Sequence, residues 1–426
     1  MKLGKHSVKG RIGLVFFCSF HINLILMLLI ILPPSFYSFK EYLNLPKIET
    51  GFYGLADTGD MDLSSESLAM AVEEGNASII EGILNTASDI LNQDVKLKSD
   101  ILAVMENQNA YESWPKLFYD ADTDSLLTVY SSGHDHAGIN KDIYLSKYKD
   151  GEISYFKVGD ANGDSLKPIG IFKFDSKYVV FATVAEGWVD GVDRLVRFTS
   201  EDMITWKKTA VGFPFSDDAQ GGINIDNVTM IDGMLFVNLS YYEDGKAYVC
   251  YSSNGGYTWE RSEALTYSEK YVPCEFMFYK IDESIIMLAR KGIAAEEYNN
   301  TPYFSISKDY GKTWSPFKSA SGIPDSTASN LSMIKYSENK LILVYASRKE
   351  GKSGIYYTVT NHDYAIKSVF EAPKKIMGGV PSSDFGYPSC VLTPDGLYYV
   401  YYSLSKNDGT DNHTSIYLCK LTETEK

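Results

Sequence analysis

The longest run of apolar positions lies near the start of the chain. Residues 12–32 read IGLVFFCSFHINLILMLLIIL, 21 residues without a formal charge, which is long enough to cross about 30 Å of hydrocarbon as a helix. Four basic residues precede this run: Lys2, Lys5, Lys9 and Arg11. A signal peptide usually has a shorter apolar core and a small-residue cleavage site, and no A-x-A site follows here. Because basic residues stay cytoplasmic, residues 1–35 are predicted to form a cytoplasmic tail and a single-pass anchor, with the rest of the chain outside the cytoplasm.

Helical periodicity appears between residues 64 and 108. Apolar positions recur there at helical spacing: Ile79, Ile80, Ile83, Leu84, Ala87, Ile90 and Leu91. Ser78 and Glu81 match a capping box at the start of this run. We therefore expect residues 36–110 to form a helical stalk or an oligomerising segment.

The period changes to that of strands after Ser113. Short runs of Val, Leu, Ile, Tyr and Phe alternate with turns rich in Gly, Asp and Asn. The runs that open each unit begin near Pro115, Pro168, Asn224, Pro273, Asn330 and Tyr387, about 50 to 60 residues apart. Six similar units indicate sheets repeated around a centre, because this arrangement leaves only short, protected sheet edges. The prediction is an all-β domain over 111–426, a six-bladed β-propeller with four strands in each blade.

A recurrent turn supports this repeat. Residues 252–259 and 307–314 both fit S-x-[DN]-x-G-x-T-W, and residues 200–206 are a shorter copy without the glycine. The Asp or Asn can accept hydrogen bonds from turn amides, Gly supplies a positive φ, and Trp packs between sheets. We assign a structural role to eight residues of these turns: Asn254, Gly256, Trp259, Asp309, Gly311, Trp314, Asp202 and Trp206.

Composition excludes several classes of function. Lys and Arg number 40 against 55 Asp and Glu, a net charge of −15, which argues against nucleic acid as a partner because phosphate contacts need a basic patch. The chain has no CxxC pair, no GxxxxGK[ST] loop and no HExxH helix, so we expect neither a cofactor nor a metal. The five cysteines are too few for a disulfide scaffold. Cys390 and Cys419 fall on two predicted strands of one blade, where they either pair or serve as small buried hydrophobes.

The turns, their period and the flanking strands resemble those of the sialidase superfamily of six-bladed propellers, whose repeated turns are called Asp-boxes or BNR repeats. The resemblance covers residues 113–426. It implies a tyrosine nucleophile backed by a glutamate, an aspartate acid/base, and three arginines that bind a substrate carboxylate bidentately. A neutral tyrosine suits an anionic sugar, because it avoids the repulsion that a carboxylate nucleophile would meet.

Three of these roles can be carried over by matching segments. Cys274-Glu275-Phe-Met-Phe and the following Ile-Ile-Met-Leu-Ala-Arg290 resemble the segment in which the glutamate opens one strand and an arginine ends the next. Phe385-Gly-Tyr387-Pro resembles the last-blade segment that holds the nucleophile. The resemblance therefore implies Tyr387 as nucleophile, Glu275 as its base and Arg290 as one carboxylate ligand.

The first unit departs from the family pattern. The family has Arg-Ile-Pro before the first strand, whereas this chain reads Ser113-Trp114-Pro115-Lys116. Lys116 can supply charge but lacks the fork geometry of arginine. Arg348 is the best further ligand, and Asp135, in the loop His134-Asp135-His136, is the candidate acid/base. We assign substrate contacts to Arg290, Arg348, Lys116, Trp114, His134 and His136.

Three functions remain open. The first is a membrane-anchored glycoside hydrolase acting on an extracytoplasmic glycan, with sialic acid as one candidate sugar. The second is a non-catalytic glycan-binding propeller, which the incomplete arginine set favours. The third is a polysaccharide lyase, because His, Asp and Tyr side chains also suit proton abstraction.

Overall fold

The computed structural model describes residues 15–19, 22–26, 95–105, 110–134, 140–185, 194–215, 222–267, 272–291, 301–320, 322–323, 331–348, 353–378, 385–404 and 413–424. These residues are all-β apart from one short helix, α4 (His362–Ala365). The predicted fold class is therefore correct at the level of an all-β domain.

Four of the sheets follow one another along the chain, each antiparallel. The first has the order β11-β10-β9-β8, with β8 (Ser165–Phe174), β9 (Lys177–Ala185), β10 (Arg194–Ser200) and β11 (Lys207–Ala210). The second contains β12 (Ile223–Asn224), β13 (Thr229–Ile231), β14 (Met234–Tyr241), β15 (Lys246–Ser252) and β16 (Glu260–Arg261). The third contains β17 (Pro273–Ile281), β18 (Ser284–Lys291), β19 (Tyr303–Ser307) and β20 (Lys318–Ser319). The fourth contains β21 (Ser332–Ser337), β22 (Lys340–Ser347), β23 (Gly354–Thr360) and β24 (Lys374–Gly378).

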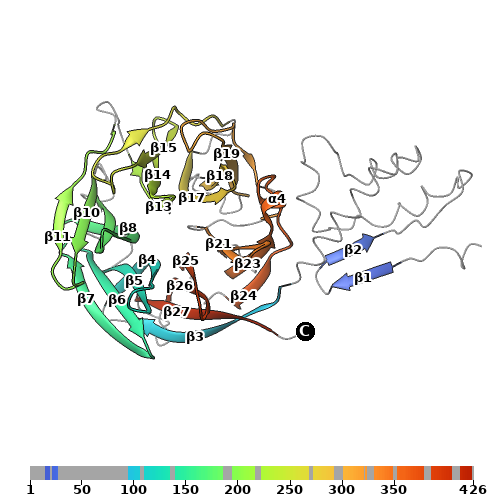
Figure 1. Ribbon diagram of the computed structural model, residues 1–426, viewed down its shortest axis with the longest axis horizontal. Coiled ribbons are helices and arrows are strands. Elements are labelled where there is room, and N and C mark those ends of the chain that lie inside the picture. The colour runs from blue at the N-terminus through green and yellow to red at the C-terminus, as the bar shows by residue number, and fades with distance from the viewer. Residues whose placement is uncertain are drawn as a thin grey trace, which may run out of the picture.

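The remaining strands of the ring form one larger sheet that joins the two ends of the domain. It runs β25-β26-β27-β4-β5-β6-β7, with β25 (Gly386–Thr393), β26 (Gly396–Leu404), β27 (Thr414–Glu423), β4 (Tyr111–Asp120), β5 (Ser125–Gly133), β6 (Asp142–Lys149) and β7 (Glu152–Gly159). A single parallel pair, Thr414 with Tyr111, links β27 to β4. Figure 1 shows the sheets standing around a common centre, with β4, β8, β13, β17, β21 and β25 on the inner side.

The predicted stalk is wrong over its last part. Residues 97–105 form strand β3 (Leu97–Met105), which pairs antiparallel with β27 along the sheet edge. An N-terminal strand thus covers the last C-terminal strand, which satisfies backbone groups that an open edge would expose. The helical positions 79–91 and the capping-box residues lie outside the described residues.

The predicted membrane anchor overlaps a short hairpin. Strands β1 (Val15–Ser19) and β2 (Ile22–Leu26) pair antiparallel within the apolar run. In the part of the chain that the structure describes, no helix has the length and apolar character needed to span a membrane. The anchor therefore stays a prediction from the sequence.

The middle strands of the sheets, such as β5, β14, β18 and β22, are buried on both faces because each sheet packs between two others. In β14, Leu235 and Val237 point into one apolar core shared with β9, whereas Phe236 points into the next, shared with β17 and β18. Alternate residues of a strand face opposite sides, so one strand contributes to two cores. This explains why the strand sequences read as continuous apolar runs.

The recurrent turns have the predicted structural role. Asp309 Oδ1 accepts the Thr313 amide at 2.9 Å, and Trp314 Nε1 donates to the Gly311 carbonyl at 3.0 Å. In the shorter copy, Trp206 Nε1 donates to the carbonyl of Met203, which takes a φ of 64° in the absence of a glycine. These turns close hairpins and carry no polar contact to the centre of the ring.

Gly256 provides a stability test of this turn. Its φ is +82°, and a Cβ at this position would overlap the ring of Phe181 in the neighbouring sheet. We expect Gly256→Ala to lower the free energy of unfolding by roughly 2 to 4 kcal/mol, from left-handed backbone strain together with overpacking. Chemical denaturation measures this loss of unfolding free energy. Gly255→Ala is the matched control, because Gly255 also has a positive φ but its nearest neighbour lies 3.9 Å away; equal losses for both variants would contradict the packing role.

Cys250, Cys274, Cys390 and Cys419 are free. Cys390 on β25 and Cys419 on β27 both lie opposite Tyr399 of the intervening strand β26. Two strand spacings of about 4.8 Å separate them, which exceeds the Cα separation that a disulfide spans. The pairing is therefore excluded, and the alternative of small hydrophobes is confirmed by the buried thiol of Cys419.

Candidate functional site

Three inner strands carry the same local irregularity. The pairing register shifts between Ser113 and Lys116 in β4, between Cys274 and Met277 in β17, and between Gly386 and Ser389 in β25. Within each shift one non-glycine residue takes a left-handed conformation, with φ values of 55° for Trp114, 51° for Glu275 and 52° for Tyr387. Bulges re-aim side chains, and strained backbone concentrates at functional sites.

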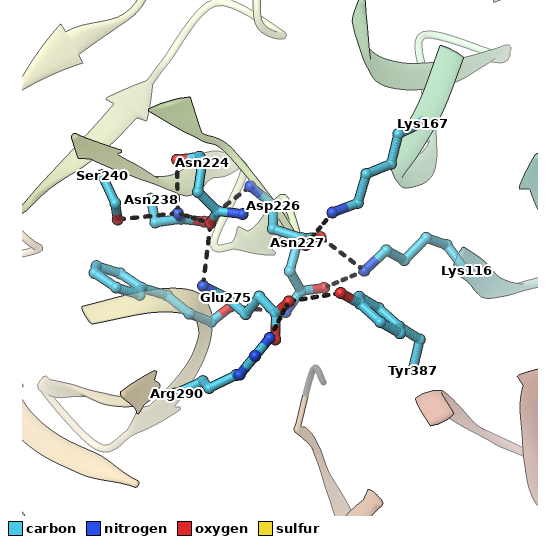
Figure 2. Close-up of polar contacts among 11 residues, drawn as sticks. Lys116, Lys167, Asn224, Asp226, Asn227, Asn238, Ser240, Glu275, Arg290 and Tyr387 are labelled. Atoms are coloured by element: carbon cyan, nitrogen blue, oxygen red, sulfur yellow. Dashed lines mark hydrogen bonds and ion pairs between the residues drawn. The ribbon is translucent and has the colours of Figure 1, made fainter. Parts of the chain in front are cut away.

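Tyr387 and Glu275, 112 residues apart in the sequence, meet at the centre of the ring. The Tyr387 hydroxyl donates to Glu275 Oε1 at 2.5 Å, and Arg290 Nη1 donates to the same oxygen at 2.9 Å (Figure 2). Both Tyr387 and Glu275 are less than a tenth exposed. Glu275 Oε2 is also buried and has no hydrogen-bond partner among the described residues. The predicted nucleophile, base and first arginine therefore form one connected unit.

The environment keeps the Tyr387 phenol neutral. Burial raises its pKa well above the ordinary value, the charges of Glu275 and Asp226 raise it further, and Arg290 opposes them. A neutral phenol attacks only if its proton leaves as the new bond forms. Glu275 Oε1 already accepts that proton's hydrogen bond, so it is placed to take the proton.

A second polar cluster lies beside this unit. Asp226, fully buried between β12 and β13, binds Lys167 Nζ at 2.7 Å and Lys116 Nζ at 3.5 Å. Lys116 Nζ also donates to Asn227 Oδ1 at 3.3 Å, while Asn227 Nδ2 donates to the carbonyl of Phe276, next to Glu275. Figure 2 shows the two lysines and Tyr387 pointing toward a common point from separate strands.

An asparagine scaffold fixes the position of both clusters. Asn238 on β14 accepts the Asp226 amide at 2.9 Å and donates to Asn224 Oδ1 at 2.8 Å. Asn224 Oδ1 in turn accepts the amide of Glu275 at 3.3 Å. The backbone of Asp226 and the bulge of Glu275 are thus held by one buried hydrogen-bond network.

Lysines also surround the aromatic rings of the site. Lys167 Nζ lies 5.3 Å from the Trp114 ring centre and 5.5 Å from that of Tyr387. Lys141 Nζ lies 4.4 Å above Trp114. Burial lowers the pKa of Lys116 to about 8, an effect that Asp226 opposes and Lys167 reinforces. The Trp114 ring therefore lies close to the ammonium groups of Lys141 and Lys167, and it is buried among the inner strands.

Of the other predicted site residues, Arg348 lies beside the candidate nucleophile, whereas the loop that begins at His134 is described only in part. Arg348 Nε donates to the Phe385 carbonyl at 2.8 Å, and Arg348 Nη2 donates to the Tyr402 hydroxyl at 2.9 Å. The Tyr402 ring lies 5.9 Å from that of Tyr387, so Arg348 contacts the surroundings of the nucleophile. His134 is exposed at the end of β5, and Asp135 and His136 lie outside the described residues.

Sequence reasoning missed Lys167, Asp226 and the asparagine scaffold. A signal for them existed, because Lys167 precedes the proline that opens its unit just as Trp114 does, and Asp226 follows the start of the next unit by two residues. Alignment of the six units would have placed both residues at the inner end of their strands, beside Lys116 and Glu275.

A buried carboxyl near Trp114 gives a testable pH dependence. Burial raises the pKa of Glu112 from 4.5 to about 8, while hydrogen bonding from Ser132 and the charge of Lys141 oppose this shift. Between these two values the folded chain holds a proton that the unfolded chain has lost, so the stability of the wild type falls as pH rises through that window.

We expect Glu112→Gln to remove this fall. Relative to wild type, the variant should gain roughly 2 to 5 kcal/mol of unfolding free energy between pH 5 and pH 8. Urea denaturation of both proteins at the two pH values measures the difference. Parallel pH dependences would show that Glu112 ionises normally in the folded chain.

The comparisons with known proteins can now be set against this geometry. The sequence profile of the BNR repeat-like domain family matches residues 125–400, more than half of the chain. The chain belongs to this family. No curated protein sequence matches it.

Solved structures show that this BNR repeat-like protein shares its fold with sialidases. A protein of unknown function from Dyadobacter fermentans has a TM-score of 0.62 and 14% identity, over 76% of this chain and 98% of that one. The NanB sialidase from Streptococcus pneumoniae has a TM-score of 0.57 and 13% identity, over 76% of this chain and 70% of NanB. The Trypanosoma rangeli sialidase, in complex with 2,3-difluorosialic acid as a covalent intermediate, has a TM-score of 0.55 and 12% identity, over 76% of this chain and 59% of that one.

Proposed function

We propose that this protein is a glycoside hydrolase of the sialidase type that cleaves glycans bearing an anionic sugar. The observation that carries the proposal is the 2.5 Å hydrogen bond from the Tyr387 hydroxyl to Glu275, two buried residues on separate bulged strands. Burying a phenol and a carboxylate together at the centre of the ring costs more desolvation than burying an apolar pair, so the pairing favours a chemical role over a packing role. We further propose that the ring is a propeller of six blades, with the larger sheet contributing two of them.

Cleavage would occur by two displacements at the anomeric carbon. In the first, Tyr387 Oη bonds to that carbon while its proton passes to Glu275, the glycosidic C–O bond breaks, and Asp135 protonates the leaving oxygen. In the second, water attacks the same carbon and gives a proton to Asp135, while Tyr387 leaves and recovers its proton from Glu275. Atoms and charges balance over the cycle, and Asp135 keeps the acid/base role that the sequence resemblance gives it.

The substrate class is proposed from the sialidases that share this fold. NanB and the Trypanosoma rangeli enzyme are named sialidases, and this chain shares their fold. Sialylated glycans are therefore the first substrates to test. A neutral phenol suits such a substrate, because it does not repel the sugar's own carboxylate.

Product analysis separates this proposal from its competitors. The full-length protein is incubated with a fluorogenic aryl sialoside and with a panel of uronic-acid polysaccharides. Release of the free sugar and the aryl alcohol supports the hydrolase. An unsaturated product absorbing in the ultraviolet would replace it with a lyase, and glycan binding without turnover of any substrate would replace it with a binding protein.

Two observations favour the non-catalytic alternative. Arg290, the predicted carboxylate ligand, is committed to Glu275 at 2.9 Å, and Lys116 stands in the first unit where the family has arginine. The binding protein is therefore the second candidate function.

We also propose that residues 12–32 tether the protein to a membrane with the ring outside the cytoplasm. Support comes from the uncharged 21-residue run and the basic residues before it. Alkaline carbonate extraction of the full chain from cells, with protease protection of the C-terminal domain, tests both parts.

A further inference from the structure

The three bulged inner strands are held by the same kind of contact. Two residues before each left-handed residue, a backbone carbonyl accepts a hydrogen bond from a side chain of another strand or sheet. The donors and acceptors are Thr414 and Glu112 before Trp114, Ser240 and Pro273 before Glu275, and Arg348 and Phe385 before Tyr387. In the first two strands a hydroxyl group is sufficient for this contact. An arginine at the third position is therefore larger than the carbonyl requires.

The additional atoms of Arg348 reach a second residue beside the candidate nucleophile. Arg348 directly follows β22, and its Nη2 donates to the Tyr402 hydroxyl at 2.9 Å. Tyr402 is fully buried, it lies opposite Gly386 in the pairing of β25 with β26, and its ring centre is 5.9 Å from that of Tyr387. One guanidinium group thus holds both the backbone that precedes Tyr387 and the ring that packs against it.

This double contact holds a strained conformation in place. Tyr387 has a φ of 52°, and a non-glycine residue keeps such a conformation only where its surroundings enforce it. The planar guanidinium presents its donors in a rigid fork. It therefore fixes the Phe385 carbonyl, at 2.8 Å from Nε, and the Tyr402 hydroxyl relative to each other.

We propose that Arg348 is a positioning residue for Tyr387, which aims the phenol at Glu275 and at the carbon to be attacked. This inference rests on the proposed function for the reaction of Tyr387. It deepens that function by assigning to Arg348 an effect on the nucleophile in place of the carboxylate contact that the sequence resemblance implies. Loss of a carboxylate ligand weakens binding of the sugar acid, whereas loss of a positioning residue slows bond formation at unchanged binding.

The position of the phenol can be tested without turnover. Full-length protein carries tyrosine isotopically labelled at Cζ, and the NMR resonance of Tyr387 is identified by its loss in Tyr387→Phe. We expect this resonance to shift or split in Arg348→Lys, because lysine keeps the charge but lacks the fork that fixes the two acceptors. Tyr402→Phe removes the acceptor hydroxyl alone and should shift the resonance in the same direction, which keeps the test valid if Arg348→Lys does not fold. An unchanged Tyr387 resonance in the folded variants would overturn the proposal.

Covalent trapping separates the positioning role from the ligand role. The reagent is 2,3-difluorosialic acid, which forms the covalent intermediate of the Trypanosoma rangeli enzyme. Arg348→Lys should lower the rate constant for labelling of Tyr387 by roughly 10- to 100-fold and leave the half-saturating concentration within about threefold of wild type. Tyr402→Phe should slow labelling by a smaller factor. A half-saturating concentration raised about tenfold or more, at an unchanged rate constant, would show that Arg348 binds the carboxylate and would overturn the proposal.

Arg261→Lys is the matched control for the same substitution. Arg261 lies exposed on the outer strand β16, where its Cζ is 4.4 Å from the ring centre of Tyr248. This variant should match wild type in both measurements. If the reagent labels neither wild type nor any variant, the proposed hydrolase is refuted, and a Tyr387 resonance that shifts in Arg348→Lys but not in Arg261→Lys still supports the positioning role.

Discussion

Replacing Tyr387 with phenylalanine is expected to lower kcat for sialoside hydrolysis at least about a thousandfold, because it removes the oxygen that we propose forms the covalent bond to the sugar. The ring stays in place, and the variant loses the hydrogen bond that the phenol donates to Glu275. Losing a single buried hydrogen bond costs about 1 kcal/mol of stability, so the fold should survive. Steady-state kinetics with the fluorogenic sialoside, alongside thermal unfolding, measures both effects.

Tyr399→Phe is the control for this variant. Tyr399 is also buried and its hydroxyl also makes a side-chain hydrogen bond, with Ser99 at 2.8 Å, but it lies in the sheet core on β26. It should keep kcat within a factor of two or three of wild type. A Tyr387→Phe variant with a tenth or more of wild-type kcat would rule out Tyr387 as the nucleophile.

Glu275→Gln should reduce kcat by roughly 10²- to 10⁴-fold, the range for loss of a general base. The amide has nearly the same shape but cannot take the proton of Tyr387, and it leaves Arg290 without its opposing charge. The charge of Glu275 also raises the pKa of Tyr387, so the variant should have a phenol that ionises at lower pH. We therefore expect the residual activity of Glu275→Gln to keep rising with pH in a range where the activity of the wild type no longer increases.

Glu371→Gln controls for the loss of a buried carboxylate. Glu371 is 9% exposed and lies 3.9 Å from Lys374 Nζ, just before the outer strand β24. It should leave both kcat and the pH profile unchanged. A Glu275→Gln variant whose kcat and pH profile match those of wild type would show that Glu275 only supports the bulge.

The features that could be predicted from the sequence are those that depend on short patterns of neighbouring residues. The Asp-box turns follow from the spacing of Ser, Asp or Asn, Gly and Trp, because each turn is held by its own hydrogen bonds. Glu275 and Tyr387 were found through short segments that open inner strands. In these cases the residues that define the structure are neighbours in the chain.

The missed features depend on contacts that no local pattern records. Strand β3 was included in the predicted stalk because its sequence, LKSDILAVM, contains no aromatic residue and no hairpin turn, and its identity comes from pairing with β27, more than 300 residues later. Asp226 and Lys167 belong to adjacent sheets 59 residues apart, and only the closed ring brings them together. The separation of Cys390 from Cys419 likewise follows from the strand order of one sheet. Long-range register set each of these outcomes.

The most direct measurement for the account is covalent trapping. The full-length protein is treated with 2,3-difluorosialic acid, the compound found as a covalent intermediate in the Trypanosoma rangeli enzyme, and the intact mass and peptide masses are determined. We predict one added sugar per chain, located on Tyr387, and no addition to Tyr387→Phe. A labelled wild type with the sugar on another residue, or an unlabelled one that nevertheless hydrolyses sialosides, would contradict a tyrosine nucleophile at the centre of this ring.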